Sequence, residues 1–277
     1  MNGQTLIADS GSTKTDWALG TVRVRTQGIN PFHQDATVIR AVLRNELTPQ
    51  LEATEIRRVA FYGSGVRPEL EEKMVSILRE FFPQAVEIEA HGDLLGAARA
   101  LCGHEAGIAC ILGTGANSCL YDGKQIVSNI PPLGYILGDE GSGAVLGRNF
   151  LNSLYKNRLS SAIREEFEAT QAVKMADVIE RVYRQPMANR WLASLSVFIH
   201  RHLCEPEVKA LVMDNFRDFI VRNIVPYHRP DLPVSAVGSI AYYFREQLCE
   251  VAKKEGYTVG RILHSPLDAL VEMEDLG

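Results

Sequence analysis

The sequence predicts an α/β protein built from two similar domains. Its 277 residues exceed what one compact core usually holds, so two domains of roughly 100 to 150 residues each are expected. A strand-turn-strand unit with a polar, glycine-rich tip occurs twice, at residues 5–27 and again at 107–128. Around these units apolar strands alternate with helical stretches, a pattern typical of sheets flanked by helices.

The first unit begins with an apolar strand at Thr5–Ala8. A turn rich in glycine, serine and threonine follows at Asp9–Thr15, and then a second strand at Asp16–Leu19 and the alternating residues Val22 and Val24. Short apolar runs separated by small polar residues predict a meander of three strands.

The second unit repeats this plan. Ile108–Leu112 is an apolar strand, Gly113–Asn117 a polar turn, Ser118–Tyr121 a second strand and Gln125–Ser128 a third. Two such units suggest two similar domains whose turns address one ligand. Two unrelated hairpins are the alternative.

The rest of the first half predicts helices at 34–47 and 68–81, with a buried strand at Val59–Tyr62 between them. That strand ends in Gly63-Ser64-Gly65. Asp93 then opens an apolar helix, which it could begin as the N-cap residue.

The second half predicts a long helical stretch at 144–225, broken at Pro186 and Pro206. A strand at Val234–Val237, the Gly238-Ser239 turn and an amphipathic helix to Lys254 follow. A last helix is expected at about 265–275, with Ser265 as its cap and Asp268 reaching back to the helix start.

Composition excludes several classes of partner. The formal net charge of -5 and the pI of about 5.8 give no attraction to nucleic acid or to an anionic membrane. No stretch approaches the roughly 18 apolar residues of a membrane span, and no signal peptide is evident. Five cysteines without a CxxC pair predict reduced, buried thiols. We therefore expect a cytoplasmic protein with no nucleic-acid or membrane partner.

The first turn has the composition of a phosphate-binding loop. Gly11 allows a tight backbone, so that N-H groups and the hydroxyls of Ser12 and Thr13 could surround phosphate oxygens, with Lys14 adding charge. Asp9 could hold Mg²⁺ through water. No glycine immediately precedes Lys14, so the Walker A pattern is absent. An ordinary polar hairpin is the alternative.

The second turn lies between strands and lacks the glycines of a dinucleotide-binding fingerprint. Gly113, Thr114 and Gly115, followed by Asn117, therefore predict a second phosphate-binding hairpin. A plain turn is the alternative.

Three carboxylates are candidates for the chemistry. Asp93 could orient an acceptor hydroxyl and take its proton, unless it only caps its helix. Asp139 and Glu140, in the GDEGSG turn, could accept hydrogen bonds from the hydroxyls of a polar substrate. Their alternative role is to stabilise the following helix through its dipole. Metal-ligand spacing, HExxH and GxSxG are absent, which argues against zinc and serine hydrolases.

Taken together, the segments DSGSTKTDWALG, GTGANS, GDEGSG and AVGSIA resemble the BadF/BadG/BcrA/BcrD ATPase family and, within it, the N-acetylglucosamine kinases. The matches run from residue 9 to about 268. The resemblance implies two actin-like ATPase domains of the hexokinase/actin/Hsp70 type, each a five-stranded mixed sheet with flanking helices, around an interdomain cleft. The expected domains are 1–105 and 106–277, with the last helix able to pack back on the first.

The resemblance also implies roles for single residues. It places the ATP phosphates at Gly11, Ser12, Thr13, Lys14, Thr15, Gly113, Thr114 and Gly115, the nucleoside beside Gly238 and Ser239, and the catalytic base at Asp93. The implied amino-sugar contacts are Asn30, Ser64, Thr114, Gly115, Asn117, Asp139 and Glu140. The sequence departs from the family at residues 130–137, which replace the usual glycine- and tryptophan-rich stretch.

The expected activity is transfer of the γ-phosphoryl group of MgATP to the 6-hydroxyl of N-acetylglucosamine or a related amino sugar. The expected partner is the sugar, and homodimerisation is left open. One alternative is a BadF-type ATPase that activates a dehydratase through a [4Fe-4S] cluster, which would need exposed cysteines. Cys110 and Cys119 instead flank a hairpin, and Cys102 lies in an apolar helix. The other alternative is a sugar-sensing protein without catalysis.

Overall fold

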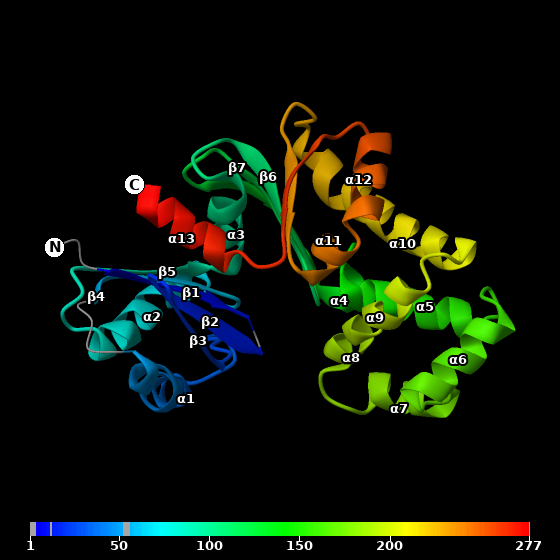
Figure 1. The fold of residues 1–277 in the computed structure, drawn as a ribbon, viewed down its shortest axis with the longest axis horizontal. Coiled ribbons are helices and arrows are strands. Elements are labelled where there is room, and N and C mark those ends of the chain that lie inside the picture. Colours follow the sequence, from blue (N-terminus) through cyan, green and yellow to red (C-terminus); the bar gives the residue numbers. More distant parts are fainter. Residues whose placement is uncertain (1–3, 12, 52–55, 277) are drawn as a thin grey trace. The chain divides into compact units, whose positions relative to one another are not determined.

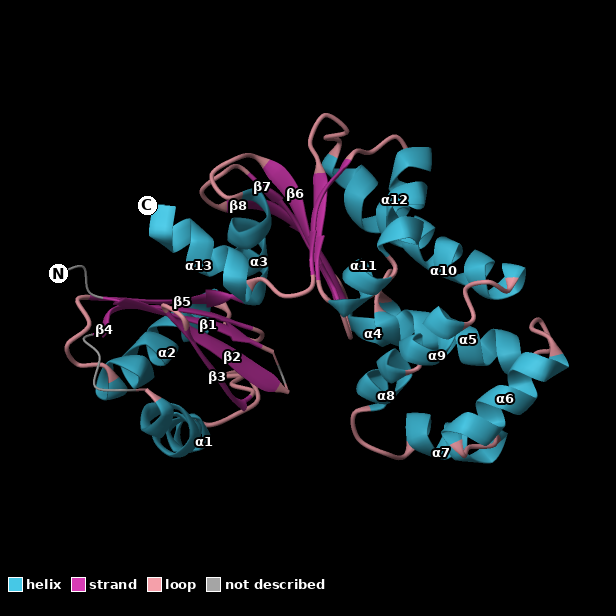
Figure 2. Ribbon diagram, in the orientation of Figure 1, coloured by secondary structure: helices cyan, strands magenta, loops and turns pink. Residues whose placement is uncertain are grey.

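The structure is a computed structural model that describes residues 4–11, 13–51 and 56–276. The chain divides into two compact units. Unit 1 comprises Met1–Glu105, Asp122–Ile126 and Ser265–Gly277, and unit 2 comprises Ala106–Tyr121 and Val127–His264. Each unit holds a five-stranded mixed sheet flanked by helices (Figures 1 and 2), so the predicted fold class is confirmed. Within the described ranges, no helix is long and apolar enough to cross a membrane.

The sheet of unit 1 has the strand order β3-β2-β1-β4-β5. Strands β1, β2 and β3 form the predicted antiparallel meander, whereas β4 and β5 run parallel to β1. The strand bounds are β1 Gln4–Ser10, β2 Lys14–Leu19, β3 Val22–Gln27, β4 Ile56–Gly63 and β5 Glu87–Gly92. The sequence did not predict β5.

The first turn is shorter than predicted. Because Asp9 pairs with Asp16, and Ser10 with Thr15, the ladder between β1 and β2 continues further toward the tip. Four residues of the predicted turn, namely Asp9, Ser10, Lys14 and Thr15, are therefore strand residues.

Helices cover both faces of the sheet in unit 1. They are α1 Ala36–Val42 with the π-helix Leu43–Leu47 and the 3-10 turn Thr48–Gln50, α2 Pro68–Phe81, α3 Asp93–Cys102 and α13 Leu267–Leu276. Helices α1 and α2 lie on one face, and α3 and α13 on the other (Figure 1). Leu6 and Ala8 join the core with α1 and α2. Ile7 points to the opposite face and is buried as well, as expected for a sheet covered on both sides.

The structure describes both helix starts at which the sequence predicted a cap. Gly92 occupies the N-cap position of α3, and Asp93 is the first helical residue without a capping hydrogen bond, so the N-cap role predicted for Asp93 is wrong. At α13, the Ser265 hydroxyl accepts the Leu267 N-H at 3.5 Å. The Asp268 carboxylate accepts from Arg23 Nη2 at 2.9 Å. Helix α13 packs against α3, β1 and β2.

The sheet of unit 2 repeats the arrangement of unit 1. Its order is β10-β9-β6-β7-β8, so that β6 takes the place of β1, with an antiparallel neighbour on one side and parallel strands on the other. The bounds are β6 Gly107–Leu112, β7 Ala116–Tyr121, β8 Ile126–Ile130, β9 Val234–Val237 and β10 Val259–Leu263. Strand β10 was not predicted.

Helices form most of unit 2 and share one apolar core. Their bounds are α4 Gly134–Leu137, α5 Gly143–Tyr155, α6 Ser161–Gln171, α7 Met175–Tyr183, α8 Ala188–Ser194, α9 Ser196–Arg201, α10 Pro206–Phe219, α11 Ser239–Tyr243 and α12 Arg245–Lys254, with a π-helix at Ile220–Ile224 and a 3-10 turn at Val225–Tyr227. The helix predicted to run to Lys254 is two helices, because Phe244 leaves the helical conformation and buries its ring in the core.

The cysteines are less uniformly buried than the sequence predicts. Cys110 and Cys119 are buried in the hairpin of unit 2, but Cys102 and Cys249 are half-buried and Cys204 is exposed. Cys204 lies in the short connection before α10, outside any apolar face.

Candidate functional site

Two buried hydroxyls hold the base of the first hairpin together. Ser10 Oγ and Thr15 Oγ1 lie 2.6 Å apart, and the Ile29 N-H donates to both at 3.1 and 3.2 Å. Thr15 is fully buried, and its hydroxyl stabilises the hairpin. The phosphate contact predicted for Thr15 stays a prediction.

The tip of this hairpin consists of small residues and a lysine whose charge is paired. The Gly11 N-H donates to the Lys14 carbonyl at 2.9 Å, and Thr13 is exposed. Lys14 Nζ binds Asp16 Oδ2 at 2.6 Å, so its charge is shared with a carboxylate and is not an isolated point charge. Ser12 lies outside the described residues.

Asp9 and Asp93 form the acidic part of unit 1. Asp9 is the half-buried residue at the end of β1. Burial, followed by the negative charges of Asp93 and Asp16, raises its pKa to about 7 against the opposing charge of Lys14. Burial also raises the pKa of Asp93, against the backbone N-H groups of Leu94 and Asp93 itself. The two carboxylates are thus close enough to repel each other, although β1 and α3 are far apart in sequence.

Asn30 and Ser64 are brought together in the same unit. Gly65 has a φ of +81°, and a β-carbon there would lie 2.1 Å from Asn30 Oδ1. Asn30 Oδ1 accepts the N-H groups of Phe32 and His33, which fixes the orientation of this side chain. Ser64 Oγ is buried and has no hydrogen-bond partner in the described part of the chain. An orphaned buried hydroxyl is costly and marks a position that a ligand could satisfy.

In unit 2, the second hairpin is joined to the start of α5. The N-H groups of Gly143 and Ala144 donate to the carbonyls of Gly113 and Thr114, at 2.8 and 3.1 Å. Thr114 is exposed at the tip. Asn117 is engaged within the unit, because its Oδ1 accepts from Asn129 Nδ2 at 2.9 Å.

The acidic turn lies against this hairpin. Asp139 has a φ of +53°, and a β-carbon on Gly115 would lie 3.1 Å from Asp139 Oδ2. Burial and, to a smaller extent, the charge of Glu140 raise the pKa of Asp139 to about 6, against the hydrogen bond from the Ala116 N-H. The closing bond of the loop runs from the Asp139 N-H to the Pro132 carbonyl at 2.8 Å. Asp139 is thus held over the hairpin tip by an unusual backbone conformation.

Glu140 is held by the π-helix that follows α10. Asn223 Nδ2 donates to Glu140 Oε2 at 3.3 Å, and Arg222 Nη1 lies 3.6 Å from Glu140 Oε1. Sequence reasoning missed both partners, because they lie within the predicted helical stretch.

Gly238 connects the late turn to the same hairpin. Its φ is +122°, and a β-carbon would lie 2.4 Å from the Leu112 carbonyl oxygen and 3.3 Å from the Gly113 nitrogen. Only glycine fits here, because the backbone passes directly over the end of β6. The structure therefore places Gly238, and the exposed Ser239 after it, beside Gly113.

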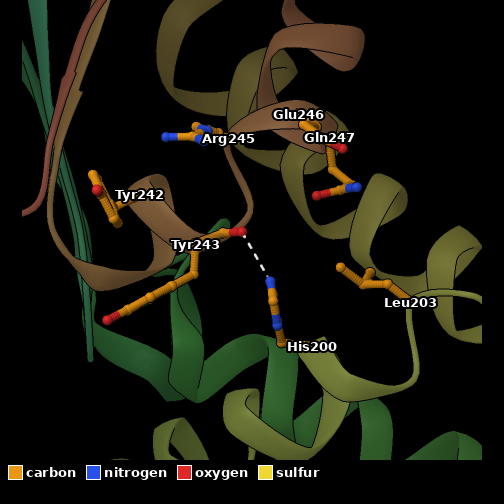
Figure 3. A pocket seen from close by; sticks show the side chains of 7 residues that line it. All are labelled: His200, Leu203, Tyr242, Tyr243, Arg245, Glu246 and Gln247. Atoms are coloured by element: carbon orange, nitrogen blue, oxygen red, sulfur yellow. Dashed lines mark hydrogen bonds between the residues drawn. The ribbon is translucent and has the colours of Figure 1, made fainter.

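Sequence reasoning missed a cavity of about 290 Å³ at the far end of α11 (Figure 3). Its lining residues are His200, Leu203, Tyr242, Tyr243, Arg245, Glu246 and Gln247. His200 Nε2 lies 3.1 Å from the Tyr243 carbonyl, which ties α9 to α11. The adjacent tyrosines were the available signal, but in the sequence they resemble ordinary helix residues.

The acidic part of unit 1 fits a magnesium ion. Mg²⁺ prefers carboxylate oxygens and is usually held by one or two of them together with substrate phosphates. Asp9 offers such a carboxylate, and a cation would offset the repulsion from Asp93 and Asp16 that its raised pKa records. Among the described residues no three His, Cys, Asp or Glu side chains form a group that could hold a metal ion by themselves.

Comparison with known proteins identifies the family. The chain is 49% identical to a Porphyromonas gingivalis protein of solved structure, described as "Putative N-acetylglucosamine Kinase"; the match covers 99% of each chain with a TM-score of 0.95. The chain belongs to the same family. A Chromobacterium violaceum protein with the same description shares this family's fold at 19% identity, with a TM-score of 0.69 over 98% of this chain and 99% of the other.

A more distant match has been solved with ligands. It is a ROK family glucokinase from Streptomyces griseus in complex with glucose and AMPPNP, 15% identical, with a TM-score of 0.56 over 99% of each chain. At this identity it shows the fold alone. No family model matches the sequence, and no curated protein matches it.

Proposed function

We propose that the chain is an ATP-dependent sugar kinase that transfers the γ-phosphoryl group of MgATP to the 6-hydroxyl of N-acetylglucosamine or a related amino sugar. Membership of the Porphyromonas gingivalis family supports the reaction class. The mechanism rests on one observation: Asp93 is a buried carboxylate at the start of α3, and its burial raises its pKa. A base of raised pKa accepts a proton from an attacking hydroxyl more readily than an ordinary aspartate.

In this mechanism Asp93 orients the sugar hydroxyl and takes its proton as the hydroxyl attacks phosphorus. Asn30 and Ser64, which lie together in unit 1, hold the sugar, and the orphaned Ser64 hydroxyl gains a partner when sugar binds. Asp9 contacts the water shell of the metal. Bound Mg²⁺ would supply charge neutralisation for the phosphates.

Unit 2 supplies the groups for the nucleotide. The hairpin tip at Gly113–Gly115, where Thr114 is exposed, binds phosphate, and Gly238-Ser239, packed against that tip, lies beside the nucleoside. Asp139 and Glu140 accept hydrogen bonds from sugar hydroxyls, which carboxylates do well because each has two acceptor oxygens. The Asn223 and Arg222 contacts hold Glu140 ready for this role.

The Asp93→Asn variant tests the proposal. It keeps the shape of the side chain but cannot accept the proton, so kcat should fall by roughly 10³-fold or more, about 4 kcal/mol in the barrier, while both ligands still bind. The matched control is Asp268→Asn, which removes the same charge from an exposed site of unit 1. Near-normal turnover in Asp93→Asn would remove Asp93 from the role of base.

A further inference from the structure

Four side chains in unit 1 contact the carboxylate of Glu89 on β5, among them Arg58, whose Nη2 lies 3.6 Å from Glu89 Oε1. Arg99 Nη1 donates to Glu89 Oε1 at 2.8 Å, and the Tyr62 hydroxyl donates to the same oxygen at 3.1 Å. His91 Nε2 lies 3.3 Å from Glu89 Oε2, and His91 Nδ1 lies 3.1 Å from Glu71 Oε1 on α2. We call Tyr62, Glu71, Glu89, His91 and Arg99 the Glu89 cluster. It joins β4, β5, α2 and α3.

The Glu89 cluster brackets Asp93 along the chain. His91 precedes Asp93 by two residues at the end of β5, and Arg99 follows it within α3. Both bind the same carboxylate, so the junction between β5 and α3 is anchored on either side. Helix α3 also lies very close to β4, because a β-carbon on Gly96 would meet Tyr62 Cβ and Cγ at 2.7 Å.

The geometry requires a particular form of His91. Each ring nitrogen faces a carboxylate, and only the protonated imidazolium can donate from both nitrogens at once. The pKa of His91 is raised by its hydrogen bond to Glu89, against burial, and further by Glu71. Burial acts to raise the pKa of Glu89, but the His91 hydrogen bond and the charges of Arg99, His91 and Arg58 outweigh it and bring the pKa to about 2.

We propose that the Glu89 cluster positions Asp93, with His91 as the positioning residue that clamps Glu89 on β5 to Glu71 on α2. This inference rests on the proposed role of Asp93 as base. When His91 loses its proton, one of its two carboxylate contacts is lost, and the end of β5 that leads into Asp93 is released from α2. Turnover should then fall although the base itself is unchanged.

The other charged and titratable groups near His91 do not account for the expected pH dependence. The Tyr62 ring lies 6.3 Å away, and burial raises the pKa of its hydroxyl far above the neutral range. Arg99 is permanently charged. Glu72 and Arg79 line a cavity of about 500 Å³ with His91, Glu71 and Glu89, so solvent protons reach the imidazole directly.

The test compares His91→Gln and His91→Lys in sugar-kinase assays across pH. Gln can donate one hydrogen bond but carries no charge, so kcat should fall by about tenfold or more with KM little changed, as expected when a catalytic group is slightly misplaced. The wild-type enzyme should lose kcat on the alkaline side as His91 deprotonates. His91→Lys, which keeps its charge to higher pH, should retain activity there. The control is His104→Gln, an exposed histidine of the same unit.

A second measurement does not depend on activity. Hydrogen exchange of the amides at the start of α3 should be faster in His91→Gln than in the wild type. In the wild type, exchange of these amides should rise with pH by more than the intrinsic exchange rate does. The amides of α2 and of unit 2 should show neither change. Equal pH profiles of kcat and equal hydrogen exchange in all variants would overturn the inference. A variant that loses stability but changes neither its kcat profile nor its exchange would overturn it as well. A wild type that phosphorylates no sugar, but shows the localised exchange, would refute the proposed function and leave the positioning intact.

Discussion

Replacing Asp9 by asparagine should stabilise unit 1, and the structure gives the size of the effect. Asp9 has a pKa of about 7 in the fold against an ordinary 3.8. The difference of about three pKa units, at 1.36 kcal/mol each, corresponds to on the order of 4 kcal/mol of cost for keeping this carboxylate charged. Because the side chain is only half-buried, we expect solvent screening to leave about 2 to 4 kcal/mol.

The sign depends on pH. Between pH 4 and 7 the folded state holds a proton on Asp9 that the unfolded state has released, so wild-type stability falls as pH rises through this range. The Asp9→Asn variant lacks this slope. Its advantage should be full at pH 8 and should shrink toward zero as pH approaches 4.

Urea unfolding followed by Trp17 fluorescence measures this effect in unit 1 alone. The chain has two tryptophans; Trp17 is fully buried in the core of unit 1, and a Trp191→Phe background removes the signal of the other. The matched contrast is Asp16→Asn, which should destabilise, because Asp16 holds Lys14 and Arg25 at 2.6 Å. Equal stability of Asp9→Asn and wild type at pH 8, or a larger gain at pH 5 than at pH 8, would refute the electrostatic reasoning.

Three further substitutions test single contacts. Ser64→Ala should raise the KM for sugar. It should leave the free energy of unfolding unchanged or raise it by about 1 kcal/mol, because the hydroxyl that it removes is buried without a partner among the described residues. A marked loss of stability in urea would contradict this. Helix propensity alone would make Gly147→Ala stabilising. We expect it instead to destabilise unit 2 by about 3 kcal/mol or more, because the new β-carbon would lie 2.0 Å from the Leu192 carbonyl oxygen. A stabilised variant would show that α5 and α8 can separate. Gly238→Ala should weaken ATP binding in calorimetry more than sugar binding, because its β-carbon pushes on Leu112 and Gly113; unchanged ATP affinity would remove this turn from the nucleotide site.

The sequence predicted those parts of the fold whose pattern is local. Both hairpins were found because small polar residues separate short apolar runs, and 68–81 was found because Pro68 starts a regular amphipathic helix. Strands β5 and β10 were missed, since each is short and is defined by pairing with a distant strand. In β5 the polar positions 87, 89 and 91 serve ion pairs, which hides the strand from a hydrophobicity pattern.

The features of the site that the sequence did not predict also depend on contacts between distant parts of the chain. Thr13 and Thr15 are alike in the sequence, but the ladder between β1 and β2 buries Thr15 and leaves Thr13 exposed. A capping role for Asp93 was reasonable from the sequence, but helix α3 begins at Asp93 itself and Gly92 takes the N-cap position. The contacts of Asn223 and Arg222 with Glu140 depend on a π-helix, and no local signal separated it from the long helical stretch.

The central claim is tested most directly by turnover across a sugar panel. Purified protein with MgATP is assayed for ADP release against hexoses, amino sugars and N-acetylated amino sugars, and the product of the best substrate is located by NMR. We predict that N-acetylglucosamine or a close relative stimulates turnover at least tenfold over water and carries the new phosphate on its 6-oxygen, and that Asp93→Asn abolishes this stimulation. ATP hydrolysis that no sugar accelerates, or phosphate on another hydroxyl, would contradict the proposed reaction.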